Sequence, residues 1–371
     1  MSYANSYSTW VEVDLGAIEN NVRHFRRLSQ AALMAIVKAN AYGHGTVPVA
    51  QAALRAGASW LGVARPDEAL QLRQAGIDAP LLLLGYTPPE QLEDMLHHKV
   101  SITVWSGEQI SLISGIAKNI GVAARLHLKV DSGMSRLGSQ TESALSMAQQ
   151  IASTPGVQFE GVFTHFATAD ETNRIPADEQ EVLFRKVIDQ LEANELRPPW
   201  VHASNSAASL NRPSAHYDLT RLGIAMYGLH PSGECLNPPE ITPALTWKSV
   251  LSQVKRLPAG RGVSYGHVYR TQAEERIGTV PVGYADGLRR VLGNQVLVGG
   301  VRVPVVGRVC MDQIMVQLDQ TPDAREGDEV VLIGKQGQEQ LTAEAMAASW
   351  GTINYEVVCG IGARVPRLYT G

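Results

Sequence analysis

The sequence is poor in cysteine, in net charge and in long apolar runs. Its 371 residues contain three cysteines, Cys235, Cys310 and Cys359. This odd number without metal-ligand spacing favours free thiols in a reducing compartment, and we expect no metal site. The net charge is −4, with acidic and basic residues interspersed. It gives no electrostatic basis for binding nucleic acid or a membrane surface.

The sequence also lacks the patterns of membrane-spanning and export segments and two common nucleotide-binding motifs. The chain has no apolar run of 18 residues, and residues 1–30 contain no apolar core of a signal peptide. We therefore expect a cytoplasmic protein. No G-x-G-x-x-G follows a predicted strand, and no phosphate loop ends in Gly-Lys-Ser/Thr. The hydrophobic fraction of 44% is typical of a globular protein, and the length predicts two domains.

What the sequence does contain is a regular alternation of strand and helix patterns up to about residue 230. After a first strand at Trp10–Val13 and an amphipathic helix, eight strands each precede a helical or helix-like segment. These eight are Met34–Val37, Leu61–Ala64, Leu81–Leu84, Ser101–Val104, Ala124–Val130, Phe159–Thr164, Trp200–Ala203 and Leu219–Arg221. Eight such units predict a closed (β/α)8 barrel of the TIM type, with an open doubly wound sheet as the alternative.

The pattern changes after residues 231–243, a segment with four prolines that we interpret as a linker. Beyond it the apolar residues alternate with period two, which predicts a mainly β domain with one helix at Thr342–Trp350. The predicted domains are 1–235, including the N-terminal strand, and 236–371. The predicted β runs are Leu245–Val254, Thr279–Val282, Gln295–Val298, Val301–Val306, Ile314–Leu318 and Glu329–Ile333.

Polar residues follow five of the predicted barrel strands, where the active sites of such barrels lie. They are Lys38, then Lys129 with Asp131, then His165, then Ser204 with Asn205, then Arg221. Lys38 ends an apolar strand, so burial could depress its pKa and favour a Schiff base, although a strand-end lysine commonly reaches solvent. Ser204 could cap a helix or bind a phosphate at its start.

Several motifs together resemble those of the alanine racemases, which are pyridoxal 5′-phosphate enzymes with a barrel and a β domain. The resemblance extends from about residue 8 to the C-terminus. The motifs are AIVKANAYGHG (35–45), LKVDSGMSRLG (128–138), THFATAD (164–170), HASNSAA (202–208), TRLGIAMYG (220–228), VSYGH (263–267), GYADG (283–287), GRVCMDQ (307–313) and INYE (353–356).

The resemblance implies a role for particular residues around the cofactor. Lys38 is implied to hold the cofactor as an internal aldimine, and Arg221 to face its pyridine nitrogen. An arginine there keeps the nitrogen an acceptor and weakens the electron sink, which disfavours transamination. The residues implied to surround the phosphate are Tyr42, Ser204, Gly223, Ile224 and Tyr355, and His165 belongs to the same cofactor-binding set.

Racemisation needs two groups on opposite faces of Cα, and the resemblance assigns them to Lys38 and to Tyr265 of a partner subunit in a homodimer. It connects Tyr265 to His165 and Arg221 through hydrogen bonds, which would lower the high pKa of a tyrosine. It assigns the alanine carboxylate to Arg136 and to the backbone N–H of Met311. The implied supporting residues are Lys129, a position carbamylated in some members, together with Asp312 and Cys310.

The implied reaction is the interconversion of L- and D-alanine, for peptidoglycan synthesis or for D-alanine catabolism. A broad-specificity amino-acid racemase is the nearest alternative, although such relatives are typically exported. A decarboxylase of this architecture would have an acidic residue in place of Arg221. A non-catalytic cofactor-binding barrel would lack the β domain, and an aldolase using Lys38 is conceivable from the fold alone.

Overall fold

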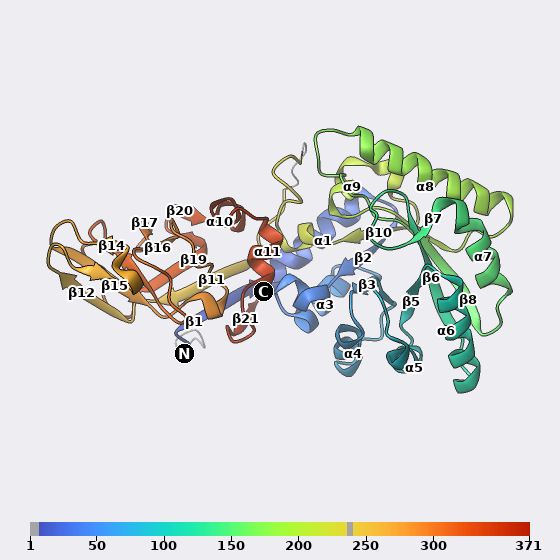
Figure 1. Ribbon diagram of the computed structural model, residues 1–371, viewed down its shortest axis with the longest axis horizontal. Helices are drawn as coiled ribbons and strands as arrows, with labels where there is room; N and C mark the ends of the chain where they lie inside the picture. Colours follow the sequence, from blue (N-terminus) through green and yellow to red (C-terminus); the bar gives the residue numbers. More distant parts are fainter. Residues whose placement is uncertain (1–6, 236–239) are drawn as a thin grey trace. The chain divides into compact units, whose positions relative to one another are not determined.

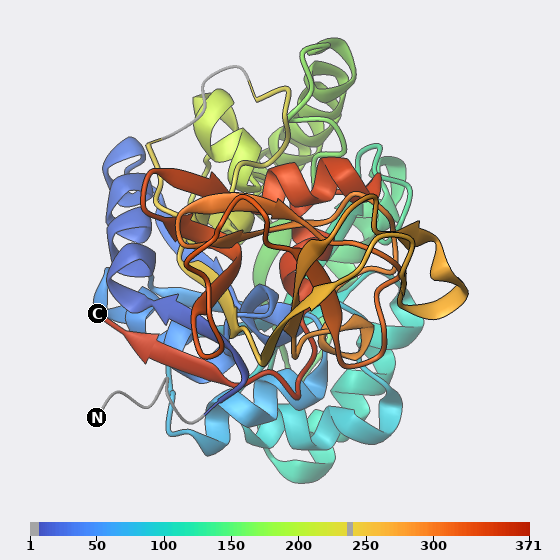
Figure 2. The ribbon, with the colours of Figure 1, turned by 90° about the vertical axis from the view of Figure 1, so that its left-hand side faces the viewer.

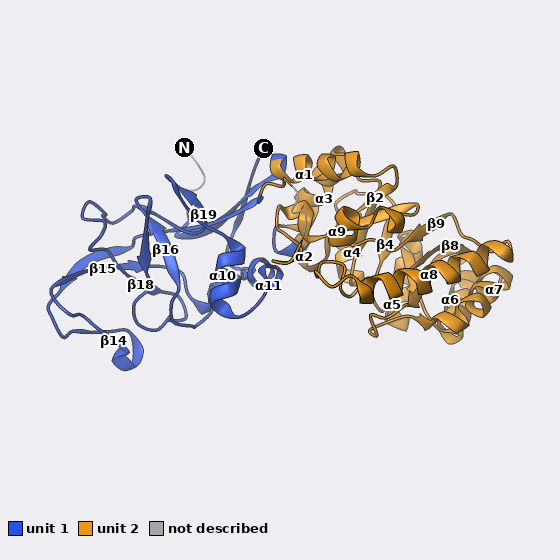
Figure 3. Ribbon diagram, turned by 90° about the horizontal axis from the view of Figure 1, so that it is seen from above, with its two compact units in different colours: residues 1–16, 42–44, 243–371 blue, residues 17–41, 45–242 orange. Residues whose placement is uncertain are grey.

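The computed structural model describes residues 7–235 and 240–371. The chain divides into two compact units, which Figure 3 colours separately. The barrel unit comprises residues 17–41 and 45–242, and the β unit comprises residues 1–16, 42–44 and 243–371. No helix within the described ranges combines the length and apolar character needed to cross a membrane.

The barrel unit contains the eight parallel strands predicted from the sequence, which confirms the fold class (Figure 1). In order around the sheet they are β10 (Leu219–Leu222), β2 (Ala32–Ile36), β3 (Trp60–Val63), β4 (Leu81–Leu83), β5 (Ser101–Val104), β6 (Ala124–Asp131), β8 (Val157–Phe163) and β9 (Trp200–His202). Backbone hydrogen bonds from Asp218 N to Val201 O, 3.0 Å, and from Arg221 N to Ser204 O, 3.1 Å, connect the last strand to the first. The sheet is therefore a nearly closed barrel.

Helices connect these strands, as the alternating pattern predicted (Figure 1). They are α1 (Leu15–Leu28), α3 (Thr46–Arg55), α4 (Pro66–Gln74), α5 (Pro89–His97), α6 (Gly107–Ile120), α7 (Ala144–Ser153), α8 (Ile175–Ala193) and α9 (Ser206–Asn211). Local signals fix their ends. Ser106 and Gln109 form a capping box at the start of α6, and Gly121 ends it in the left-handed conformation.

The β unit is built mainly from strands, as predicted. A seven-stranded sheet has the order β17 (Val301–Pro304), β16 (Gln295–Val298), β19 (Glu329–Gln336), β11 (Leu245–Val250), β1 (Thr9–Asp14) and β21 (Arg367–Thr370), with β20 (Glu339–Leu341) beside β19. Smaller sheets contain β12 (Gln253–Leu257), β15 (Glu275–Val280) and β18 (Ile314–Gln317), and β13 (Gly262–Val263) with β14 (Tyr269–Arg270). The predicted run Leu245–Val254 is thus two strands in two different sheets.

The N-terminal strand differs from the sequence expectation, which placed it with the barrel. Strand β1 pairs antiparallel with β11 and parallel with β21, so its hydrogen-bonded neighbours belong to the β unit. Figure 2 shows the red β21 beside the blue N-terminal strand. The predicted boundary after residue 235 adjoins residues 236–239, which lie outside the described ranges. The assignment of the N-terminal strand to the barrel and the boundary after residue 235 were both predicted from the order of segments in the sequence. Sequence order does not determine which strand β1 pairs with.

The single helix predicted in the β unit is present as α10 (Ala343–Trp350). Thr342 caps it, because its Oγ1 accepts a hydrogen bond from Ala345 N at 3.1 Å. A second helix, α11 (Asn354–Cys359), was not predicted. Its six residues are too few to show a helical period, and it contains Tyr355.

Candidate active site

Lys38 lies two residues after the end of β2, at the end of the barrel where the strands terminate. Its side chain is half-buried rather than fully enclosed. The chain then enters α2 (Lys38–Tyr42), which is a left-handed turn and not an ordinary helix. Ala39, Asn40, Ala41 and Tyr42 have φ values of 53°, 54°, 51° and 52°. A left-handed conformation costs an L-residue roughly 1–2 kcal/mol, so four in succession require external support.

Hydrogen bonds from the surrounding barrel residues support this turn. Ala41 N donates to Val37 O at 2.9 Å, and Ala39 N donates to Glu68 Oε1 at 2.5 Å. Asn40 accepts through its backbone oxygen from Gly45 N, 2.8 Å, and through Oδ1 from Thr46 N, 3.1 Å. The left-handed segment begins at Ala39, before Gly43 and Gly45. These contacts fix the backbone immediately after Lys38.

Arg221 on β10 is buried, with 3% of its surface exposed. Its Nη1 donates to His202 Nδ1 at 2.9 Å, and its Nη2 donates to Thr164 O at 2.8 Å, to Ala203 O at 3.0 Å and to His165 Nδ1 at 3.1 Å. All four acceptors are neutral atoms. Burial lowers the pKa of Arg221 to about 9, so the guanidinium stays charged at neutral pH. The barrel therefore contains a buried cation whose hydrogen-bond acceptors, among residues 7–235 and 240–371, include no carboxylate.

Two further predicted residues lie beside Arg221. Lys129 on β6 is 4% exposed, with Nζ 4.5 Å from the ring centre of Phe163. Burial, followed by the charges of Arg221 and Arg136, lowers the pKa of Lys129 to about 7. Burial and the neighbouring cations, Arg221 first, also bring the pKa of His165 well below its ordinary value. The site thus holds a neutral imidazole and an amine that is partly unprotonated near pH 7.

Arg136 lies in the loop after β6 and is exposed. The loop is shaped by Asp131, whose Oδ1 accepts from Gly133 N at 2.9 Å and from Ser135 N at 3.0 Å. A Cβ on Gly138 would lie 2.5 Å from Asp131 N, so only glycine fits there. Asp131 is therefore a structural residue of the loop that carries Arg136.

The predicted phosphate residues of the barrel lie after β9 and β10. Ser204 is fully buried and donates from Oγ to Ala215 O at 2.8 Å. Gly223 N donates to Ser206 Oγ at 3.0 Å, and Ile224 begins the short helical turn η4 (Ile224–Tyr227). Sequence reasoning missed Ser206, although it follows Ser204 and Asn205 in the same motif. Asn205 caps α9, its Oδ1 accepting from Ala208 N at 2.9 Å.

Tyr42 and Tyr355 are brought together within the β unit. Their ring centres are 6.1 Å apart, with the rings inclined at 48°. Tyr42 is buried, and burial together with Cys359 raises its pKa, so its hydroxyl stays protonated. A Cβ on Gly43, where φ is +82°, would lie 2.2 Å from Val358 O. Glycine at this position is therefore required for the backbone beside Tyr42 to approach α11.

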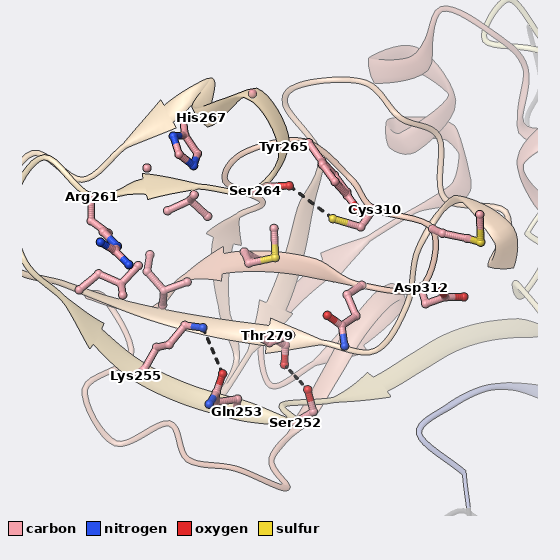
Figure 4. Close-up of a pocket in the computed structure, with 18 of the residues that line it drawn as sticks. Ser252, Gln253, Lys255, Arg261, Ser264, Tyr265, His267, Thr279, Cys310 and Asp312 are labelled. Carbon is pink, nitrogen blue, oxygen red and sulfur yellow. Dashed lines mark hydrogen bonds between the residues drawn. The ribbon is translucent and has the colours of Figure 1, made fainter.

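Tyr265 and the predicted residues Cys310, Met311 and Asp312 line one pocket of 1140 Å³ in the β unit (Figure 4). Tyr265 is 67% exposed and Met311 52% exposed, so both side chains are accessible in a single chain. Ser264 orients this segment: its Oγ donates to Arg308 O at 2.6 Å and lies 3.4 Å from Cys310 Sγ. The fold thus gathers four residues from two separate motifs.

The predicted site residues therefore occur in two groups, one in each unit. The family model described as the N-terminal domain of alanine racemase matches residues 13–231, and that of the C-terminal domain matches residues 244–369. Together these two models account for nearly the whole chain.

Whole-chain relatives agree with the family models. The alanine racemase of Symbiobacterium thermophilum is 48% identical over 366 residues, which cover 98% of this chain and 97% of the relative. The alanine racemase of Geobacillus kaustophilus is 47% identical over 367 residues, covering 97% of this chain and 94% of the relative.

Solved structures give the same result. The alanine racemase of Clostridium difficile 630 has a TM-score of 0.95 at 40% identity, covering 98% of this chain and 96% of that chain. The alanine racemase of Bacillus anthracis, solved with bound L-Ala-P, has a TM-score of 0.93 at 43% identity, covering 98% and 95%. In sequence and in fold, over almost its full length, this chain belongs to the alanine racemase family of enzymes.

Proposed function

We propose that this racemase interconverts L-alanine and D-alanine with pyridoxal 5′-phosphate attached to Lys38 and with Lys38 and Tyr265 as the two bases. The observation that carries the proposal is the set of groups at the barrel mouth. Lys38 follows β2, and a buried Arg221 at the end of β10 has only neutral hydrogen-bond acceptors. Such a site suits an anionic cofactor whose ring nitrogen accepts a hydrogen bond.

The remaining residues of the barrel fit the cofactor's phosphate. The buried hydroxyl of Ser204, the backbone at Gly223 and the start of η4 at Ile224 lie after adjacent strands. Hydroxyl groups and backbone N–H groups at a helical start are suitable donors to phosphate oxygens. To bind the phosphate, the Ser204 hydroxyl would turn from Ala215 O and the Gly223 N–H would leave Ser206 Oγ. We assign Tyr42 and Tyr355, whose rings lie close together in the β unit, to the same phosphate by family resemblance.

Pyridoxal 5′-phosphate, when bound, acidifies the Cα proton of an amino acid by withdrawing electrons. In our proposal Arg221 limits this withdrawal. Because arginine stays protonated and only donates, it leaves the ring nitrogen an acceptor. The proton removed from Cα is then returned to Cα, and proton transfer to other cofactor positions is suppressed. Arg221 thereby favours racemisation over transamination.

The second base, Tyr265, needs a donor that stabilises its deprotonated oxygen. His165 has the required form, because Arg221 Nη2 donates to its Nδ1 at 3.1 Å. The neutral imidazole then carries its proton on Nε2 and can donate it. In our proposal this N–H binds the hydroxyl of Tyr265 from a second copy of the chain. A homodimer with shared active sites follows from this assignment.

For the substrate, we assign the alanine carboxylate to Arg136 and to the backbone N–H of Met311. Lys129 supports Arg136 if its amine, with a pKa of about 7, is converted to a carbamate. Cys310 and Asp312 flank Met311, and Asp312 Oδ1 accepts from Arg364 Nη2 at 2.7 Å. We further propose that the enzyme acts in the cytoplasm, supplying D-alanine for peptidoglycan or allowing its catabolism.

Borohydride reduction tests the cofactor assignment. Treatment of the purified protein should fix the cofactor to Lys38, remove the visible absorption band and leave a modified peptide containing residues 35–45. Lys38→Ala should lose the band, the linkage and racemisation together. Lys129→Ala is the matched control, since it removes another lysine at the barrel mouth and should keep the reducible linkage. A linkage at any lysine other than Lys38 contradicts the assignment.

A further inference from the structure

The interior of this barrel is unusual because a column of polar side chains passes through it. The interior of a (β/α)8 barrel is ordinarily filled by layers of branched apolar residues. Here Glu160 on β8, His127 on β6, His202 on β9 and Arg221 on β10 are all buried, with 8%, 0%, 0% and 3% of their surfaces exposed. The first three have no place in the proposed mechanism.

These side chains form one continuous line of hydrogen bonds. Arg221 Nη1 lies 2.9 Å from His202 Nδ1, and His202 Nε2 lies 3.0 Å from His127 Nδ1. His127 Nε2 lies 3.1 Å from Glu160 Oε2. At the far end Glu160 also accepts from Ser101 Oγ and lies 3.8 Å from Arg125 Nε. The line connects Arg221 at the barrel mouth to a carboxylate deeper in the barrel.

The chemistry of these groups allows one arrangement of protons. The Arg221 guanidinium can only donate, so His202 Nδ1 must accept. A neutral His202 then carries its proton on Nε2 and donates it to His127 Nδ1. His127 must therefore carry its own proton on Nε2 and donate it to Glu160. The reverse direction would leave His202 with no proton on either nitrogen, which is an imidazolate.

The packing around the two imidazoles keeps them in place. The His202 ring stacks on Phe163, with centres 4.6 Å apart and planes at 4°. Trp60 contacts the edge of His127 at 5.6 Å between centres. A Cβ on Gly161 would lie 2.3 Å from His127 Nδ1, so this glycine leaves the space that the ring occupies. Burial, with the charge of Arg221 among the other causes, also keeps the pKa values of both histidines below the ordinary value.

We propose that Glu160 is a positioning residue for Arg221, acting through His127 and His202 as a relay of fixed proton direction. We call the four residues Glu160, His127, His202 and Arg221 the barrel relay. In the relay, His202 accepts a hydrogen bond from Arg221, and His127 accepts one from His202. Nη1 of Arg221 is therefore held in one orientation. This inference rests on the proposed function in one respect only: that the orientation of Arg221 matters for the reaction.

The relay is tested first by the protonation of its histidines. Nitrogen NMR of the holoenzyme labelled with 15N-histidine should show His127 and His202 as neutral Nε2–H tautomers. The signals should stay unchanged from pH 6 to 8, because an ordinary histidine titrates near the lower end of this range, whereas Arg221, with a pKa of about 9, stays charged across it. The variants His127→Gln and His202→Gln assign the two signals. A protonated His127, or an Nδ1–H tautomer of His202, overturns the relay whatever substitution of Glu160 does.

Substitution of the carboxylate is the second test. Glu160→Gln keeps an acceptor oxygen and should preserve both tautomers and activity. Glu160→Leu leaves the Nε2–H of His127 without its acceptor, so the Nε2 signal of His127 should shift. The value of kcat should fall roughly tenfold, the loss typical when an outer partner of a functional group is removed. The KM for alanine should change little. Ser114→Ala is the control, since it removes the 2.7 Å hydrogen bond from the buried Ser114 to Pro155 O, outside the relay.

The outcomes separate the relay from the proposed function. A folded Glu160→Leu protein with the His127 Nε2 signal and the kcat of the parent overturns the positioning role. If the parent has the expected tautomers but neither binds cofactor on Lys38 nor racemises alanine, the proposed function fails and the proton direction stands. If the parent racemises alanine with the opposite tautomers, only the relay fails.

Discussion

Arg221 Nη2 lies 3.1 Å from His165 Nδ1, so the arginine determines which nitrogen of that histidine carries the proton. A guanidinium cannot accept, and His165 must therefore accept on Nδ1 and donate from Nε2. The same arginine imposes the same tautomer on His202 through Nη1, 2.9 Å away. One buried cation thus sets the protonation of two neighbouring histidines.

A first prediction concerns the pyridine partner. Arg221→Glu places an acid where the parent has a cation, and the acid can protonate the ring nitrogen and strengthen electron withdrawal. Racemisation should fall, by tenfold or more if an interaction of roughly 1.4 kcal/mol or greater is lost, while transamination rises. Both rates are measured on one preparation. Arg221→Lys, which keeps the charge, is the control. An unchanged ratio of the two reactions would show that Arg221 does not control this choice.

A second prediction concerns pH and stability. In the folded protein the pKa of Lys129 is about 7, below its usual 10.5. Between these values the unfolded chain binds more protons, so the free energy of unfolding should rise as pH increases through this window. At about 1.4 kcal/mol per pKa unit, the cost at pH 7 is roughly 4–5 kcal/mol.

Lys129→Met should remove this dependence and stabilise the protein near pH 7. The measurement is urea unfolding from pH 6.5 to 10 in carbon dioxide-free buffer, where the amine stays uncarbamylated. Lys118→Met replaces an exposed lysine of α6 and should keep the slope of the parent. If the free energy of unfolding of Lys129→Met rises with pH as steeply as that of the parent, the pKa of Lys129 is not lowered in the folded protein.

A third prediction concerns the choice between an alanine racemase and a broad-specificity enzyme. In our proposal Tyr265 and Tyr355 crowd the position of the substrate side chain. Alanine should be preferred, serine should react weakly, and lysine and arginine should be rejected. One methylene changes discrimination by only ~1–3 kcal/mol, so weak serine activity is expected. Tyr355→Ala should reduce the difference in kcat/KM between alanine and serine. Equal kcat/KM values for alanine and lysine in the parent would instead favour a broad-specificity racemase.

A fourth prediction concerns shared active sites. Lys38→Ala and Tyr265→Ala proteins should each be inactive alone. After subunit exchange, each heterodimer contains one site with both defects and one with neither. Activity should recover to about half of wild type per heterodimer, or about a quarter for a statistical mixture. If exchange is demonstrated by mass spectrometry and no activity returns, both bases belong to the same chain.

The sequence was sufficient to predict the barrel, because strand and helix periods are local properties. All eight strands appear where the apolar runs predicted them, and α10 follows its cap at Thr342. Polar residues at strand ends led to the prediction of Lys38, His165 and Arg221 as site residues, since parallel strands bring their ends to one side. Strand β6 even contained a further signal, because Arg125, His127 and Lys129 alternate with leucines. In a parallel strand such alternation indicates a polar interior face.

Only the tertiary structure determined which segments and side chains contact each other. Local periods do not specify the partners of β1, which pairs with strands more than 200 residues away. The left-handed turn after Lys38 contradicts the local preference of its alanines and exists because Val37, Glu68 and Thr46 bind it. The hydrogen bonds from Arg221 through His202 and His127 to Glu160 connect side chains of four strands, β10, β9, β6 and β8. Such contacts depend on closure of the barrel, which no single segment of the sequence encodes.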